Sequence, residues 1–112
     1  MTHQPCPPIA VLWEPEIERL YKRLREDDPF KIAIRKGRDI LSRDRYAAQY
    51  RVPKDRIPPY YIRKNGVKNL YVLRIDKVRR LSYTIIEDKV GVKEVFPDHA
   101  SYDRRFGYLL LL

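Results

Sequence analysis

The chain has 112 residues, which is the length of one domain and too few for two separate hydrophobic cores. Its formal net charge is +9, and no apolar run approaches the length that a membrane span requires. Cys6 is the only cysteine, which excludes an intrachain disulfide and favours a reducing compartment. We therefore expect a cytoplasmic protein without membrane contact, with a single domain over residues 9–112 and a disordered tail at residues 1–8.

The positive charge is concentrated in the middle of the chain. Residues 48–86 hold ten Lys and Arg against two Asp and Glu, whereas residues 1–47 hold ten against eight and residues 87–112 hold four against five. A surface that only needs to be solvated normally mixes both signs, as the charged surfaces of thermophilic proteins do. So one-sided a segment is more typical of a surface that binds a polyanion such as RNA.

The first half of the chain predicts a strand followed by two helices. The apolar run at residues 9–13 predicts the strand. Amphipathic stripes over residues 14–26 and 28–41 predict the helices, the second of which is expected to begin at Asp28 and Pro29. Since the link between them is short, the two helices should lie antiparallel, as a helical hairpin.

The second half predicts a loop followed by strands. Prolines interrupt residues 42–68, where residues 46–51 can extend the second helix and the rest predicts a long basic and aromatic loop. Residues 69–75, 79–87 and 90–96 predict an antiparallel meander. The expected fold class is α+β, with the N-terminal strand and the two-helix antiparallel hairpin packed on one face of a twisted antiparallel β-sheet.

The register of the first two meander strands decides whether two arginines meet on the face that the helices leave open. A three-residue turn at residues 76–78 places Arg74 opposite Arg80, whereas a two-residue turn places them on opposite faces. Two adjacent guanidinium groups repel each other unless an anion lies between them, and their forks match phosphate oxygens. The pair is then a phosphate site; alternatively, each arginine is simply solvated on the sheet.

His99 follows the last predicted strand, and the other histidine of the chain lies in the N-terminal tail. An unperturbed imidazole titrates near pH ~6.5, so it can take and give a proton when RNA is cleaved by its own 2′-hydroxyl. Asp98 either orients the His99 ring or caps the turn. Tyr102 either stacks on a base or holds the terminal segment in place. His99 equally fits an ordinary surface or packing residue.

Further RNA contacts are expected from basic and aromatic residues near the strands. Tyr60 and Tyr61 lie between prolines and basic residues, where they can stack on unpaired bases, although about half of the tyrosines should belong to the core. The expected RNA-binding residues are Arg51, Lys54, Arg56, Tyr60, Tyr61, Arg63, Lys64, Lys68, Lys77 and Arg79. The cysteine, the histidines and the carboxylates match no metal-ligand spacing, and the glycines form no phosphate loop, so no metal or cofactor is expected.

With these elements in place, the chain resembles the RelE/ParE superfamily of toxins over roughly residues 9–108. Three segments carry the resemblance: Asn69-Leu70-Tyr71-Val72-Leu73-Arg74-Ile75, Arg80-Leu81-Ser82-Tyr83 and His99-Ala100-Ser101-Tyr102-Asp103. The most specific feature is the strand that contains Arg80 and Tyr83, followed about twenty residues later by His99 and Tyr102.

The resemblance implies a metal-independent endoribonuclease that cleaves messenger RNA, typically on the ribosome. It assigns Arg74 and Arg80 to the scissile phosphate, His99 to general acid or base catalysis, and Tyr102 to orienting the substrate. It also implies a cognate antitoxin in a hetero-oligomer with the toxin. The four leucines at residues 109–112 are a candidate contact for that partner or for a second copy, unless they pack on the protein's own core.

Two other functions fit the same expected fold. The RelE pattern has lysines on the strand where this chain has the apolar Val72 and Leu73. Loss of RNA-cutting residues favours the ParE-like branch, which inhibits DNA gyrase, whereas the presence of His99 argues against it. A non-catalytic RNA-binding protein would instead use the Tyr and Arg residues of 46–68, and its affinity for RNA would fall steeply with salt.

Overall fold

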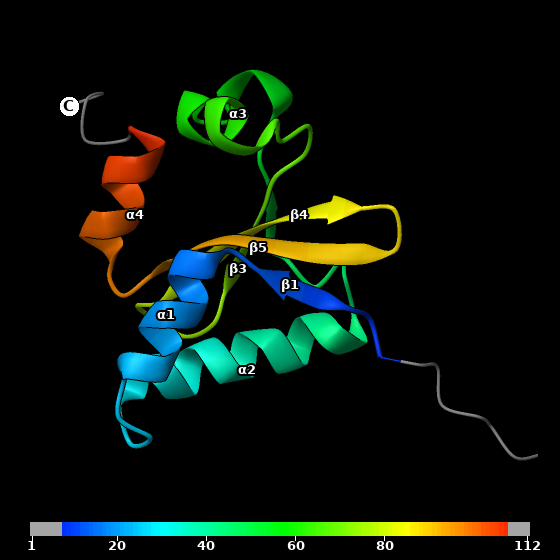
Figure 1. The fold of residues 1–112 in the computed structure, drawn as a ribbon. Helices are drawn as coiled ribbons and strands as arrows, with labels where there is room; N and C mark the ends of the chain where they lie inside the picture. Colours follow the sequence, from blue (N-terminus) through cyan, green and yellow to red (C-terminus); the bar gives the residue numbers. More distant parts are fainter. Residues whose placement is uncertain (1–7, 108–112) are drawn as a thin grey trace, which may run out of the picture.

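Five strands and four helices make up the part of the chain that the structure, a computed structural model, describes, residues 8–107 (Figure 1). In chain order they are β1 (Val11–Trp13), α1 (Pro15–Arg23), α2 (Pro29–Arg43), β2 (Tyr50–Arg51), the short 3-10 helix η1 (Lys54–Arg56), α3 (Pro59–Asn65), β3 (Tyr71–Arg74), β4 (Arg80–Ile86), β5 (Lys89–Phe96) and α4 (His99–Phe106). The predicted α+β class is confirmed. None of the described helices is long and apolar enough to cross a membrane.

The two predicted N-terminal helices form where their start signals lie. Pro15 opens α1, and the side chain of Asp28 caps α2 by accepting a 2.8 Å hydrogen bond from the backbone N–H of Phe30. The predicted extension of the second helix through residues 46–51 is wrong, because α2 ends at Arg43 and residues 50–51 pair with β3 as a strand. The predicted N-terminal tail, apart from Pro8, and the four C-terminal leucines lie outside the described residues.

The sheet is mixed rather than antiparallel throughout. Its strand order is β1-β5-β4-β3-β2, and β1 runs parallel to β5 with Val11 opposite Val90. The predicted β3-β4-β5 meander is confirmed, since both of its pairings are antiparallel. The parallel pair joins segments far apart in sequence, so its direction depends on the packing of the α1–α2 connection and not on a local turn.

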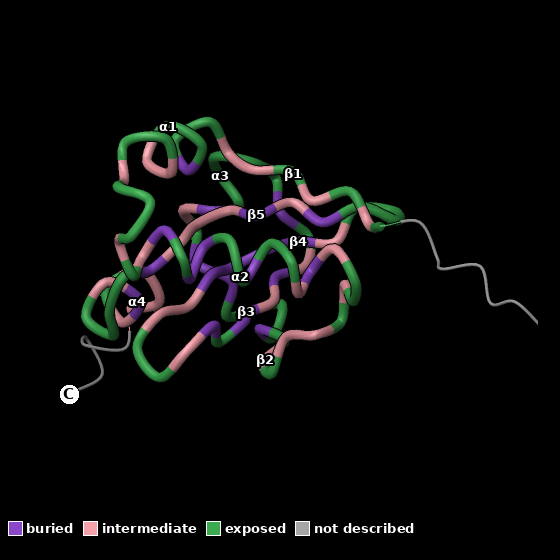
Figure 2. The backbone as a smooth tube through the Cα atoms, turned by 90° about the horizontal axis from the view of Figure 1, so that it is seen from below, coloured by how far each residue is buried: buried purple, intermediate pink, exposed green. Residues whose placement is uncertain are grey.

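Both faces of the sheet are covered, which corrects the expectation of an open face. On one face, Ile17 of α1 and Ala33 and Leu41 of α2 pack against β3, β4 and β5. On the other, Tyr61 of α3 and Tyr102 of α4 pack in a second cluster against the sheet. Figure 1 accordingly shows α2 and α3 on opposite sides of the strands, and Figure 2 shows the buried residues concentrated in the middle of the molecule.

The face that was expected to be open includes two polar side chains of β4, Ser82 and Thr84, which are 0% and 3% exposed. Ser82 shares a 3.0 Å hydrogen bond with the hydroxyl of Tyr61, and the Thr84 hydroxyl donates to the side-chain oxygen of Asn69 at 2.9 Å. Since each polar group has a partner, both can be buried without the cost of an unsatisfied group. The alternation of polar and apolar residues in β4 therefore marks two packed faces.

Gly37 of α2 packs closely against the side chain of Leu81 in β4. A Cβ atom at this position would lie 2.6 Å from Cδ2 of the buried Leu81. Gly37→Val should therefore lower the free energy of unfolding by about 1–3 kcal/mol through overpacking. Lys36→Val, at the exposed neighbouring position, should cost less than about 1 kcal/mol because only the helix propensity changes. Urea unfolding measures both, and equal losses would contradict this close packing.

Candidate active site

Arg74 and Arg80 are directly opposite each other in the β3–β4 ladder. The backbone N–H of Ile75 donates to the Arg79 carbonyl oxygen at 3.0 Å, so residues 76–78 form the three-residue connection that places the two arginines on one face. Arg74 is exposed and Arg80 is half-buried. Neither makes an ion pair within the described part of the chain, which leaves two guanidinium groups available to an anion at the end of the sheet.

The aromatic ring of Tyr102 in α4 packs against the guanidinium group of Arg80. The guanidinium carbon of Arg80 lies 4.5 Å from the centre of the Tyr102 ring, and Phe96 meets the same ring edge-on at 5.5 Å. Tyr102 is only 5% exposed. This burial corrects the expectation that Tyr102 stacks on a base: its ring belongs to the core and positions Arg80 through a cation–π contact.

His99 is the first residue of α4, and its ring contacts the turn between the two arginines. Its Nε2 atom lies 3.0 Å from the backbone carbonyl oxygen of Lys77. Because a carbonyl oxygen can only accept, this contact is a hydrogen bond when Nε2 carries a proton, and in the neutral ring Nδ1 is then the basic nitrogen. Asp98 does not orient this ring; its carboxylate caps α4, accepting from the backbone N–H and hydroxyl of Ser101 at 2.8 and 2.6 Å.

The turn that carries the Lys77 carbonyl is held by Asp76. The Asp76 carboxylate accepts hydrogen bonds from the backbone N–H of Val78 at 2.8 Å and of Arg79 at 2.7 Å, and its other oxygen accepts from the Arg79 guanidinium at 3.0 Å. Partial burial raises the pKa of the Asp76 carboxyl, but these hydrogen bonds outweigh it and hold the pKa below its usual value. Asp76 thereby fixes the carbonyl that orients His99.

Acid should weaken this turn. Because the pKa of Asp76 is lower in the folded protein, its carboxylate stabilises the fold above the pKa of the unfolded chain, and this contribution is lost as the pH falls through the folded value. Asp76→Asn should therefore flatten the dependence of unfolding free energy on pH between about pH 5 and pH 3. Urea titrations at each pH measure this slope. Asp55→Asn, which alters an exposed carboxylate without a described ion pair, should leave the slope unchanged, and equal slopes in all three proteins would contradict the account.

The expected RNA-binding residues do not form one continuous surface. Lys64 is ion-paired with Glu16 at 2.6 Å, and Arg79 with Asp76 at 3.0 Å. Tyr61 is 0% exposed, so the expectation that it stacks on a base is wrong. Lys77 lies in the turn beside His99. The exposed Arg56 lies in η1, and the exposed Arg63 lies in α3. A separate depression at the β2 edge of the sheet is lined by Arg51, Lys54 and Lys68.

A buried hydrogen-bond network that the sequence did not indicate joins α3, β4, β5 and α4. The Tyr61 hydroxyl donates to Glu94 at 2.6 Å, and Glu94 accepts two hydrogen bonds from Arg105, at 2.8 and 3.1 Å. Burial and the neighbouring Glu94 carboxylate raise the pKa of Tyr61 well above its usual value, so its hydroxyl keeps its proton. Arg105 also covers the ring of Tyr60 at 3.6 Å, leaving that ring less free for a base than expected.

The signals for α3 were present in the sequence. Pro59 occupies the first position of the helix, and Gly66 ends it with a left-handed φ of 62°. Proline at a helix start and glycine just past its end are typical helix boundaries. The predicted loop over residues 42–68 therefore contains a helix, and this helix supplies the cover for the face once expected to be open.

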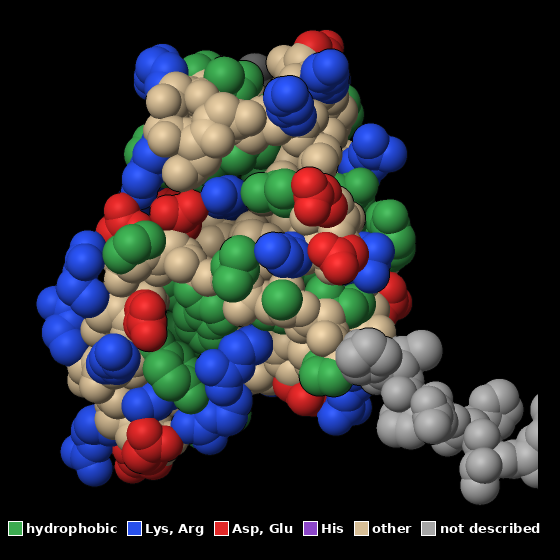
Figure 3. All heavy atoms as spheres, turned by 45° about the vertical axis from the view of Figure 1, so that its right-hand side comes forward, with side chains coloured by type: hydrophobic (Ala, Val, Ile, Leu, Met, Phe, Trp, Pro, Cys, Tyr) green, Lys and Arg blue, Asp and Glu red, His purple; other side chains and the backbone are tan. Residues whose placement is uncertain are grey.

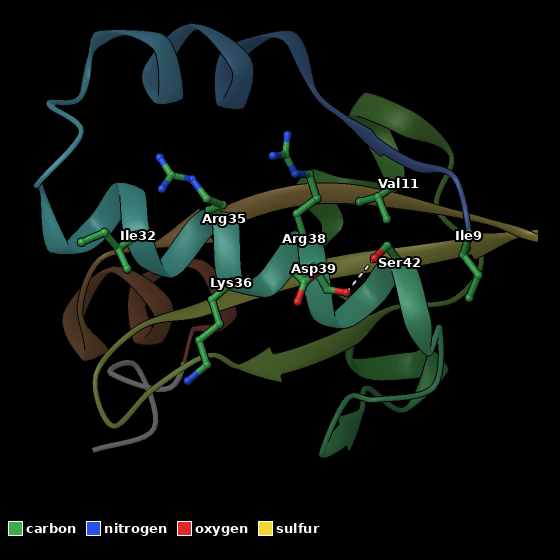
Figure 4. Close-up of a pocket in the computed structure, with 8 residues that line it drawn as sticks. All are labelled: Ile9, Val11, Ile32, Arg35, Lys36, Arg38, Asp39 and Ser42. Atoms are coloured by element: carbon green, nitrogen blue, oxygen red, sulfur yellow. Dashed lines mark hydrogen bonds between the residues drawn. The ribbon is translucent and has the colours of Figure 1, made fainter. Parts of the chain in front are cut away.

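A hollow of about 640 Å³ lies elsewhere, against α2 and β1 (Figure 4). None of the predicted site residues lines it. Arg35 at its rim is bonded to Glu26 and Tyr21, and Arg38 lies over the rings of Trp13 and Tyr21. Positive and negative side chains are interspersed on the face seen in Figure 3. Within residues 8–107, no three potential metal ligands gather closely enough to hold a metal ion.

At this end of the sheet, the imidazole of His99 can transfer a proton beside two guanidinium groups that can bind a phosphate. No family model, curated protein or solved structure matches this chain. The RelE/ParE resemblance thus stays a prediction. What the geometry brings together is Arg74 opposite Arg80, and His99 against the turn that joins their strands.

Proposed function

We propose that the protein is a metal-independent endoribonuclease toxin of the RelE type, which cleaves messenger RNA on the ribosome and is neutralised by a cognate antitoxin in the cytoplasm. One observation carries the proposal: the β3–β4 register sets Arg74 opposite Arg80, and His99 bonds to the carbonyl of the turn between them. Two guanidinium groups and an imidazole thereby share one end of the sheet.

In the proposed reaction, Nδ1 of His99 takes the proton from the 2′-hydroxyl of the substrate. The 2′-oxygen then attacks the adjacent phosphorus, the bond from phosphorus to the 5′-oxygen breaks, and the leaving oxygen takes a proton from water. The hydroxide so formed takes the proton from His99, which restores the neutral imidazole. The products are a 2′,3′-cyclic phosphate and a 5′-hydroxyl. Arg80 and Arg74 stabilise the negative charge that grows on the phosphate oxygens in the transition state.

Most cations of the basic middle segment are also available to RNA. Among the ten Lys and Arg of residues 48–86, all of them described, only Lys64 and Arg79 form ion pairs. Unpaired cations bind phosphates by releasing counterions. This excess also supports the second candidate function, a non-catalytic RNA-binding protein, which would bind RNA equally well after His99→Ala and cleave none.

Induced expression of the wild type and of His99→Ala, with mapping of the 5′ ends of messenger RNA, tests the proposal. New 5′ ends are expected with the wild type and few with the variant. Unchanged transcripts in both would overturn the nuclease proposal. Loss of plasmid supercoiling by DNA gyrase in the wild-type extract, without RNA cleavage, would instead support the ParE-like alternative.

A further inference from the structure

A second group of cations lies at the edge of the sheet that β2 forms. A depression of about 350 Å³ is lined by Arg51, Lys54 and Lys68 together with Val52, Ile57 and Asn69, besides Pro53. No carboxylate lines it, and none of its three cations makes an ion pair with a described residue. Asp55, the nearest acidic residue in sequence, is exposed and does not line the depression.

The walls of this depression are held in place by hydrogen bonds. The backbone N–H of Val52 donates to the Leu70 carbonyl oxygen at 2.9 Å. The side-chain oxygen of Asn69 accepts from the backbone N–H of Ile85 at 2.8 Å, and its amide nitrogen donates to the Ile85 carbonyl oxygen at 2.9 Å. Arg51 is paired opposite Tyr71, and its guanidinium lies 5.6 Å from the centre of that ring. The backbones that carry Arg51 and Lys68 are thus fixed.

Three like charges around one depression repel one another unless an anion lies between them. Phosphate groups suit such a site because Arg and Lys bind them through charge-assisted hydrogen bonds. Three cations spread around a depression of about 350 Å³ match the several phosphates of an RNA backbone better than they match one compact anion.

We propose that Arg51, Lys54 and Lys68 form a remote phosphate-binding site that holds the backbone of single-stranded RNA beyond the scissile phosphate. The inference rests on the proposed function. Arg51 lies opposite Tyr71, three residues before Arg74 in β3, or about 10 Å along the strand. Because β2 is the outermost strand next to β3, an RNA strand can run along this edge of the sheet from one site to the other (Figure 2).

The binding test uses a triple variant, Arg51→Ala, Lys54→Ala and Lys68→Ala. Its matched control carries Arg19→Ala, Arg23→Ala and Lys36→Ala, which removes three exposed positive charges from α1 and α2. A fluorescent 12-nucleotide RNA with 2′-O-methyl groups throughout, which cannot be cleaved by 2′-attack, is titrated at several salt concentrations. The triple variant should bind about 10–100-fold more weakly than the wild type, and its salt slope should fall by about 2, whereas the control changes little.

The cleavage test compares RNA lengths. On a 12-nucleotide substrate the triple variant should raise KM while leaving kcat unchanged, and on a dinucleotide, whose single phosphate cannot occupy both sites, it should match the wild type. Binding equal to that of the wild type, or equal losses with both lengths, would overturn the remote site. Displacement of RNA by polyglutamate at equal charge concentration would overturn its assignment to RNA. Weaker binding by the triple variant in a protein that cleaves no RNA would support the site and refute the nuclease proposal instead.

Discussion

Replacing Arg80 by alanine is expected to slow RNA cleavage by roughly 10²–10³-fold, because a donor aimed at the transition-state charge is lost. Arg80→Lys should recover only part of the rate, since an ammonium group keeps the charge but not the two-pronged geometry. Single-turnover cleavage of a model RNA by the purified variants measures both effects. Arg19→Ala, which removes an exposed arginine of α1 far from this face, should cleave at the wild-type rate.

Arg80 also rests on the Tyr102 ring, so its removal could act through the fold. A cation–π contact of this kind is worth about 0.5–1 kcal/mol, which is too little to unfold the domain. Urea unfolding of Arg80→Ala should therefore show a small loss of stability beside the large loss of rate. Cleavage by Arg80→Ala at the wild-type rate would refute the role of Arg80 at the phosphate.

Replacing His99 by alanine is expected to slow cleavage by about 10²–10⁴-fold, the usual contribution of a general acid or base. His99→Gln is the sharper variant, because its amide can still donate to the Lys77 carbonyl while offering no titratable nitrogen. Single-turnover cleavage of a model RNA by the purified variants measures both rates.

Full activity of His99→Gln would contradict proton transfer by His99. The only remaining role of the wild-type imidazole would then be its hydrogen bond to the Lys77 carbonyl. Asp98→Ala gives a useful contrast, since Asp98 caps α4 through Ser101 and does not contact the imidazole in the described hydrogen bonds. That variant should loosen the start of α4 and reduce the rate much less than His99→Gln does.

The register of the candidate site could be predicted from sequence because it depends on a local turn. Residues 76–78 are too few to allow more than two registers, and Asp76 supplies the acceptors that hold the three-residue form. The helix start at Asp28 was predictable for the same reason, since a cap acts within a few residues. Turns and helix caps of this kind depend on residues that are close in sequence, so the sequence predicts them.

The covering of the second face could not be predicted in the same way. Ser82 and Thr84 alternate with apolar residues as in a strand with one solvated face, yet Tyr61 and Asn69, distant in sequence, provide the hydrogen bonds that allow both to be buried. Tyr61 comes from a segment whose prolines suggested a loop. The prediction that Tyr61 stacks on an RNA base is wrong for this reason. Its ring was expected on the surface but forms part of the core.

The central claim is that Arg74, Arg80 and His99 form an RNA-cleaving site that works through the 2′-hydroxyl. Its most direct test is cleavage of a messenger RNA on ribosomes by the purified protein in the presence of EDTA, with a single 2′-deoxy substitution at the cleaved position. Cleavage of the all-ribose RNA to a 2′,3′-cyclic phosphate and a 5′-hydroxyl, abolished by the substitution, is the predicted result. No cleavage of the all-ribose RNA, or cleavage that survives the 2′-deoxy substitution, would contradict it.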